Sequence, residues 1–271
     1  SHDDYTYAHI EEGTSNPGYF TYKKIEEDVP EDIDDIIPSD GGNGQTSGAY
    51  TVLQNGTLTF YHDNNRNSKT GTVYDIYTSY TGYPDWAKDS LSITKVVFDV
   101  SFINFKPTCT AYWFSCCPIM TEIEGLGRLD TRNVTDMRYM FHNCRSLKKL
   151  DTGDFLTSQV TDMSNMFSGC HKLSSVDVTC FNTSNVTTME TMFMDCRSLT
   201  EIDVTGFETK NVSTMAHMFR GCNSLTEVNL KNMSIASLRS TYAMFYDCDA
   251  LTTIYSNTDW SAGNITSSDL D

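Results

Sequence analysis

The chain has 271 residues, of which 39% are hydrophobic, and its 36 acidic and 19 basic side chains give a formal net charge of −17 at pH 7. This charge argues against nucleic acid or an anionic membrane surface as a partner, because both require a basic face. No apolar run approaches the length of a membrane span, so direct insertion into a membrane is not expected.

Residues 1–48 form an acidic segment that ends in a glycine-rich linker. Eleven of the first 38 residues are acidic, and they are densest over residues 26–35. A charge run of this kind favours a solvated tether, whereas a calcium site would need an alternating Asp loop that is absent here. A short strand is expected within residues 19–25, and residues 39–48 have the composition of a flexible linker.

A β-rich region follows at residues 49–110. Two stretches flank Asn55-Gly56, a dipeptide typical of tight β-hairpins. Repeat proteins need a cap over the end of their apolar core, and this region is the predicted N-terminal cap. The aromatic residues of this region and of the few residues that follow it, which include Trp86 and Trp113, are expected to fill the core of the cap; a sugar-binding platform is the alternative.

Residues 111–271 carry the most specific signal, a repeat of 26 residues. The second row reads VTDMSNMFSGCHKLSSVDVTCFNTSN. A fixed period of this length indicates a solenoid, in which each unit buries its apolar face against its neighbours. Another row starts near Ile265, and we expect it to be cut short in mid-coil at Asp271. The five regular rows begin at Val134, Val160, Val186, Val212 and Leu238.

Each row divides into two parts. Between Val160 and Cys170 the apolar residues are spaced by three and four, the period of a helix face. Thr161 is a suitable N-cap for such a helix, and Thr187 with Glu190 matches a capping box. The following Leu-x-x-Val-Asp-Val alternates, which predicts a strand. The expected fold is therefore an α/β, right-handed leucine-rich-repeat solenoid, with a parallel sheet on one face, short helices on the other and a β-rich N-terminal cap.

Stacked rows should place equivalent side chains in ladders. We expect the Met at position seven of each row, the Phe after it and the following Leu to face the core. One cysteine per row supplies no second ligand in a fixed position, which favours buried free thiols over a metal site. A disulfide, if one forms, is expected between Cys109 and Cys116 or Cys117. The ladder cysteines are Cys144, Cys170, Cys196, Cys222 and Cys248.

These rows resemble the BspA-like family of leucine-rich-repeat bacterial surface proteins, in the branch with VTxMxxMFxxCxxLxxIDVTxFxT repeats. The match is close over residues 117–260 and looser back to about residue 50. The resemblance implies an exported, extracellular protein of the cell surface that takes part in adhesion to host molecules or other cells. It supplies no catalytic residues. Three rows depart from the Asp-Val-Thr pattern, at residues 151–153, 229–231 and 255–256.

Signatures of catalysis are missing. The chain has no His-Glu-x-x-His, no Gly-x-Ser-x-Gly and no phosphate-binding loop, and none of its six histidines has a fixed cysteine partner. We therefore expect no enzymatic activity, no cofactor and no metal.

The candidate ligand-binding surface is a mainly acidic strip on the concave sheet, the usual binding surface of solenoids. It consists of the residues on either side of the inward Ile or Val of each strand. The predicted partner is a host extracellular-matrix or cell-surface protein with a basic face. A glycan bound by the aromatic cap, a structural spacer, and a sheet face that is merely solvated remain alternatives. The strip comprises Lys149, Asp151, Ser175, Asp177, Glu201, Asp203, Glu227, Asn229, Thr253 and Tyr255.

Overall fold

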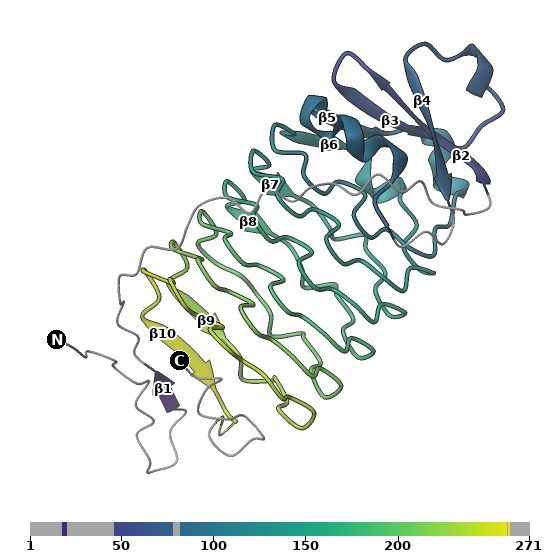
Figure 1. Ribbon diagram of the computed structural model, residues 1–271. Helices are drawn as coiled ribbons and strands as arrows, with labels where there is room; N and C mark the ends of the chain where they lie inside the picture. The colour runs from purple at the N-terminus through teal and green to yellow at the C-terminus, as the bar shows by residue number, and fades with distance from the viewer. Residues whose placement is uncertain (1–17, 21–45, 78–81, 259, 261–271) are drawn as a thin grey trace.

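The computed structural model describes residues 18–20, 46–77, 82–258 and 260. Figure 1 shows the repeat region as successive turns of the backbone stacked side by side, with the cap at one end of the stack. The acidic run at residues 26–35 and the row expected from Ile265 lie outside the described residues.

The cap is built on a five-stranded sheet in the order β4-β2-β3-β5-β6. Its first three strands pair antiparallel, and Asn55 and Gly56 both have positive φ in the predicted hairpin turn. The next two pairs are parallel, so the sheet of the cap continues in the polarity of the rows as far as β6, which lies in the irregular row before Val134. The strands are β2 (Thr46–Gln54), β3 (Thr57–Tyr61), β4 (Thr72–Tyr77), β5 (Lys95–Phe98) and β6 (Glu122–Glu124). β2 begins inside the predicted linker, which is therefore shorter than expected.

The rows pair in parallel with the 26-residue register of the sequence. Leu150 in β7 (Lys149–Leu150) lies opposite Val176 in β8 (Ser175–Val176), and Val228 in β9 (Glu227–Asn229) lies opposite Ile254 in β10 (Thr253–Ser256). On another side of each row, single parallel bridges join Asp136, Asp162, Thr188, Thr214 and Ser240 in turn. The predicted parallel pairing is therefore confirmed for these two pairs of rows. Residues 201–203 of the row between them, which were also predicted to form a strand, are described but form none, so β7–β8 and β9–β10 belong to separate sheets.

The prediction of short helices on the face opposite the parallel sheet is wrong. Short 3-10 helices are the only helices among the described residues, and they are η1 (Arg66–Ser68), η2 (Asp85–Ser92), η3 (Val100–Asn104) and η4 (Leu126–Arg128). The segment of each regular row that was expected to be helical is instead a run of tight turns.

Two backbone features of these turns exclude a helix. Met140 N donates to Met137 O at 3.3 Å, which is a turn, whereas Phe141 N donates to Met166 O of the next row at 2.9 Å. Tyr139 and Asn143 have φ of 57° and 58°, and equivalent residues of the later rows are also left-handed. A left-handed residue every four positions interrupts a helix. Apolar residues spaced by three fit a turn closed between i and i+3 as well as a helix face.

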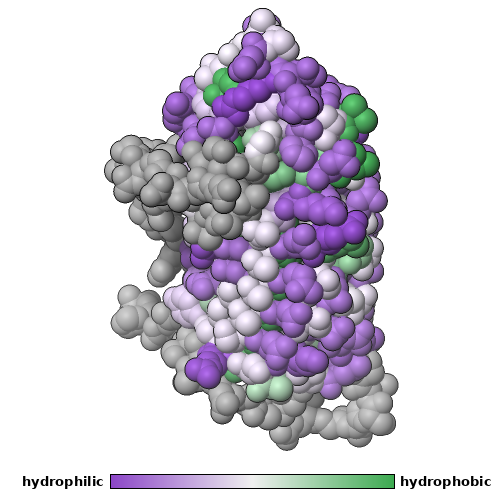
Figure 2. Space-filling model, turned by 90° about the vertical axis from the view of Figure 1, so that its right-hand side faces the viewer, coloured by the Kyte–Doolittle hydropathy of each residue, from purple (hydrophilic) through white to green (hydrophobic). Residues whose placement is uncertain are grey.

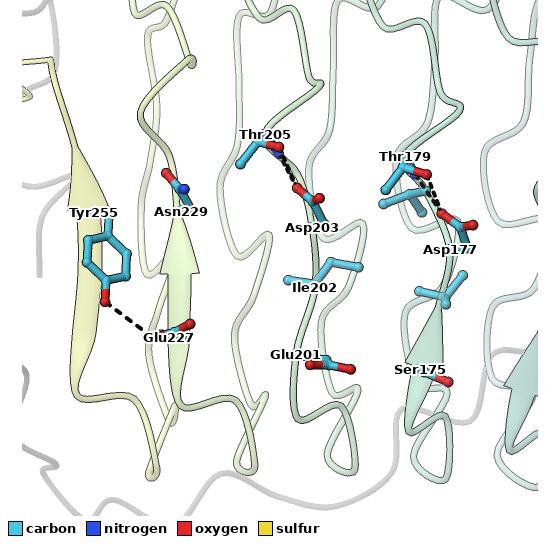
Figure 3. Close-up of a pocket in the computed structure, with 12 residues that line it drawn as sticks. Ser175, Asp177, Thr179, Glu201, Ile202, Asp203, Thr205, Glu227, Asn229 and Tyr255 are labelled. Atoms are coloured by element: carbon cyan, nitrogen blue, oxygen red, sulfur yellow. Dashed lines mark hydrogen bonds between the residues drawn. The ribbon is translucent and has the colours of Figure 1, made fainter.

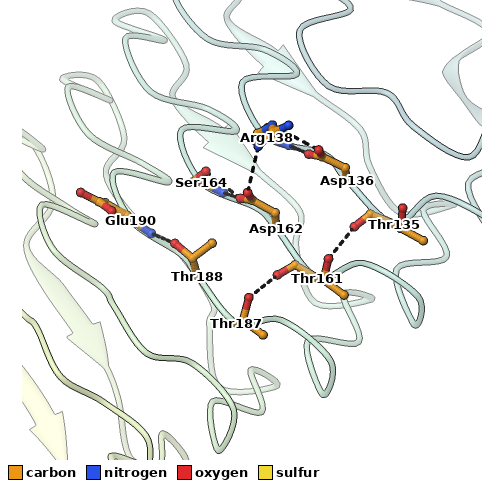
Figure 4. A network of polar contacts seen from close by, with 9 residues as sticks. All are labelled: Thr135, Asp136, Arg138, Thr161, Asp162, Ser164, Thr187, Thr188 and Glu190. Atoms are coloured by element: carbon orange, nitrogen blue, oxygen red, sulfur yellow. Dashed lines mark hydrogen bonds and ion pairs between the residues drawn. The ribbon is translucent and has the colours of Figure 1, made fainter. Parts of the chain in front are cut away.

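The threonines predicted as helix caps connect rows instead (Figure 4). Thr161 donates to Thr135 O through both N, at 2.8 Å, and Oγ1, at 3.1 Å. Thr187 repeats this contact with Thr161 O. The capping box does not form, since Glu190 N donates to Thr188 Oγ1.

The predicted inward ladders are confirmed by burial. The five Met and five Leu residues of the ladders are buried, and four of the five Phe residues are fully so. The rings of Phe141, Phe167, Phe193 and Phe219 stack with centroids 5.4–5.6 Å apart. Figure 2 shows one side of the molecule, where hydrophilic and intermediate residues cover most of the surface.

All nine cysteines are free thiols, including Cys109, Cys116 and Cys117. The five ladder cysteines are buried, and burial raises the pKa of each thiol, to about 12 for Cys170 and Cys248. Each ladder Sγ donates to the carbonyl oxygen of the Phe one row earlier. The ladder therefore contributes packing and hydrogen bonds between rows.

A short strand lies at the far end of the stack from the cap. β1 (Gly18–Phe20) pairs antiparallel with β10, in the order β1-β10-β9, and Tyr19 lies opposite Tyr255 (Figure 1). A strand was expected within residues 19–25, but its pairing with the most distant described row was not.

Candidate functional site

The residues predicted to form the outward strip do face solvent. All ten are exposed or half-buried, while the residue between each pair, such as Ile202 or Val228, is buried. Where the rows form strands, the alternation follows from the strand geometry, in which successive side chains point to opposite faces.

Seven of the ten strip residues line one hollow of about 430 Å³ on the sheet face (Figure 3). We call it the sheet-face hollow. Lys149, Asp151 and Thr253 lie outside its lining. The hollow is lined by Ser175, Val176, Asp177, Val178, Thr179, Glu201, Ile202, Asp203, Thr205, Glu227, Asn229 and Tyr255.

Two of its carboxylates are held in place by hydrogen bonds from the Thr two residues further along the chain. Asp203 Oδ1 accepts hydrogen bonds from Thr205 N at 3.0 Å and from Thr205 Oγ1 at 2.6 Å. Asp177 and Thr179 repeat the same two distances one row earlier. Asn229 Oδ1 fulfils this role with Lys231 N, at 3.1 Å. The position therefore needs an oxygen acceptor but not a negative charge.

The electrostatics of the hollow are one-sided. It contains four carboxylates and no Lys or Arg, and among the described residues none of the four forms an ion pair with a basic side chain. Hydrogen bonds from the Thr179 side chain and backbone hold the pKa of Asp177 below its ordinary value, and Thr205 does the same for the pKa of Asp203. Both side chains are therefore charged at neutral pH.

An aromatic side chain marks one end of the hollow. Tyr255 Oη donates to Glu227 Oε2 at 3.3 Å, and the Lys231 ammonium lies 5.2 Å from the centre of the Tyr255 ring. This end thus combines a flat apolar surface with a carboxylate and a nearby cation.

Thr179 and Thr205 were missed as members of the site. Their signal is present in the sequence, because each lies two residues after an Asp, the spacing at which Asp accepts from the backbone two residues on. They hold the carboxylates in a fixed orientation.

The two tryptophans of the alternative sugar-binding platform are buried. Trp86 and Trp113 are only 2% and 5% exposed, and Trp86 Nε1 donates to Trp113 O at 2.7 Å. Phe60 packs against both rings at 5.4 Å. These residues form the core of the cap, as the sequence predicted, and present no face to a sugar.

In the described part of the chain no three His, Cys, Asp or Glu side chains are grouped to hold a metal ion. No helix in those residues has the length and apolar character needed to cross a membrane.

Comparisons with known proteins give a family. The model of a family described as Mycoplasma protein of unknown function, DUF285, matches residues 111–225 and 174–269, more than half of the chain. No curated protein matches. A leucine-rich repeat protein from Eubacterium ventriosum is 17% identical over 75% of each chain, with a TM-score of 0.22. A leucine rich cell surface protein from Faecalibacterium prausnitzii is 16% identical over 83% of this chain and 97% of its own, with a TM-score of 0.19.

Proposed function

The chain belongs to DUF285, a BspA-like leucine-rich-repeat family of Mycoplasma proteins of unknown function, and from this membership we propose that it is a non-enzymatic interaction module of the cell surface. In this proposal it is exported, adopts a right-handed solenoid, and adheres through the sheet-face hollow to a host extracellular-matrix or cell-surface protein with a basic face.

The proposal rests on the charge of the hollow, which no basic side chain among the described residues neutralises in an ion pair. Its four carboxylates come from three consecutive rows, which at a strand spacing of about 4.8 Å extend over about 10 Å. Carboxylates left without ion pairs on a fixed scaffold attract Lys and Arg side chains, and such attraction raises the rate of association with a basic partner. Salt should weaken the association, because the hollow is accessible to solvent ions.

Isosteric neutral substitutions test the proposal without disturbing the turns. The test variant combines Asp177→Asn, Glu201→Gln and Asp203→Asn, and Asn229 shows that an amide oxygen satisfies the same turn. The control combines Asp154→Asn, Glu190→Gln and Glu208→Gln, three exposed acids outside the hollow, with the same change of net charge.

Binding of the three proteins to immobilised matrix proteins, to host cells and to a glycan array is measured at low and physiological salt. The proposal expects at least tenfold weaker protein binding for the test variant and little change for the control. Equal binding by the test variant and the parent would refute the role of the hollow. Binding to glycans alone would favour the carbohydrate alternative, and no binding at all would favour a structural spacer.

A further inference from the structure

The pairing of β1 with β10 differs in polarity from that of the rows. The row pairs β5–β6, β7–β8 and β9–β10 are all parallel, whereas β1 lies antiparallel on β10. β1 therefore does not continue the 26-residue repeat. It is an added strand on the outer edge of β10.

The outer edge of β10 presents its own hydrogen-bonding groups to β1. Tyr255 O accepts from Leu230 N at 2.8 Å, so the backbone of Tyr255 faces β9. Because the peptide groups of a strand alternate in direction, Ile254 and Ser256 face the opposite edge. Their partners in β1 are Phe20 and Gly18.

The two strands differ in how well they are protected as edges. β10 reads Thr-Ile-Tyr-Ser, with no charge and no proline, and a strand of this kind is a template for pairing with another chain. β1 is three residues long, and in the sequence Pro17 precedes it and Lys23 and Lys24 follow shortly after. Short length, proline and lysine are the features that discourage further pairing at a sheet edge.

We propose that β1 covers a strand-acceptor edge on β10 and so prevents a second copy of the chain from pairing there. Two β10 strands related by a two-fold axis would be antiparallel, the polarity that β10 accepts from β1. Neither strand carries a charge that would oppose such a pair. The inference concerns the sheet edge and does not depend on the ligand of the hollow.

The chain is long enough for β1 to reach β10 of its own molecule. Residues 21–45 connect β1 with β2 and can extend over about 80 Å, while rows stacked at about 4.8 Å place β10 about 40 Å from β2. Pairing within one molecule is therefore expected.

A disulfide tests which molecule supplies β1. Tyr19 and Tyr255 form a pair that exchanges no backbone hydrogen bonds, where the two Cα atoms lie about 4.5 Å apart, within the range that a disulfide spans. The full chain with Tyr19→Cys and Tyr255→Cys should form an intrachain disulfide on mild oxidation, while either single variant should not. An interchain disulfide, or none, would overturn the proposal.

Proline at Phe20 tests the consequence of losing β1. Phe20→Pro removes the N–H opposite Ile254, and Phe20→Ala keeps it and serves as the control. Light scattering over a range of concentrations should show a doubled mass for the proline variant alone, and a peptide of residues 16–22 should reverse it. A proline variant that stays monomeric at high concentration, although hydrogen exchange shows the β10 amides exposed, would refute pairing with a second copy. Circular dichroism confirms that both variants remain folded.

Discussion

The Sγ of Cys196 donates a hydrogen bond of 3.2 Å to the carbonyl oxygen of Phe167, in the preceding row. The same oxygen accepts Cys170 N at 3.2 Å, so it joins a turn within one row to a thiol of the next. The thiol is fully buried.

Cys196→Ala should therefore destabilise the chain by about 1–2 kcal/mol, from a lost hydrogen bond and a small cavity. Cys196→Ser keeps a donor and should cost less. Urea unfolding of the two variants measures the difference. Equal losses for Ala and Ser would show that the bond to Phe167 contributes nothing beyond packing.

Leu225 tests the depth of the core. The side chain is fully buried, and Leu225→Ala should cost about 2–5 kcal/mol because the neighbouring rows close the cavity only in part. Leu91, which is 71% exposed, provides the control, and its replacement by Ala should change stability by less than about 0.5 kcal/mol. Similar unfolding midpoints for the two variants would contradict the ladder.

We expect the buried side chain of His142 to make the folded chain less stable in acid. Burial, with a smaller contribution from Arg145, lowers the pKa of His142 to about 4, below the ordinary 6.5. Between these two values the unfolded chain binds a proton that the folded chain does not, so stability falls as the pH drops from 6.5 to 4. The shift corresponds to about 3 kcal/mol over that range.

The change that isolates this contribution is His142→Ser, because Ser168 occupies the equivalent position in the next row and is buried there. Urea unfolding of parent and variant is compared between pH 4 and 7. The stability of the variant should fall less steeply with acid, since the other titrating groups are common to both proteins. Parallel curves would mean that His142 is protonated in the folded state near its ordinary pKa.

The sequence determines far more of the register than of the local backbone. The spacing of Met, Phe, Cys and Leu predicted which residues are buried, and Leu-x-x-Ile-Asp-Val predicted which face outward. Helices were predicted where tight turns occur, because a spacing of three does not distinguish the two. The amides that would close a helix instead bond to the next row, and that choice depends on the stack.

Two features of the site region were not predicted from the sequence, for different reasons. The contact of β1 with β10 joins segments near opposite ends of the chain, and nothing in Gly18–Phe20 specifies its partner. The turns at Asp177 and Asp203 were readable from the Asp-x-Thr spacing, but both residues had been interpreted only as surface charge.

Substitutions of Asp203 can separate the hydrogen-bonded turn of this residue from its negative charge. Asp203→Ala removes the acceptor of Thr205 N and Oγ1, whereas Asp203→Asn keeps an oxygen in place and removes only the charge. Alanine should cost about 1 kcal/mol of stability, the usual net value of a hydrogen bond at a surface turn, and asparagine should cost less. Both should weaken binding of a basic partner to the same extent, because both remove the charge. Urea unfolding and binding measured on the same two variants decide the matter. If asparagine bound like the parent while alanine did not, the turn rather than the charge would be what the partner recognises.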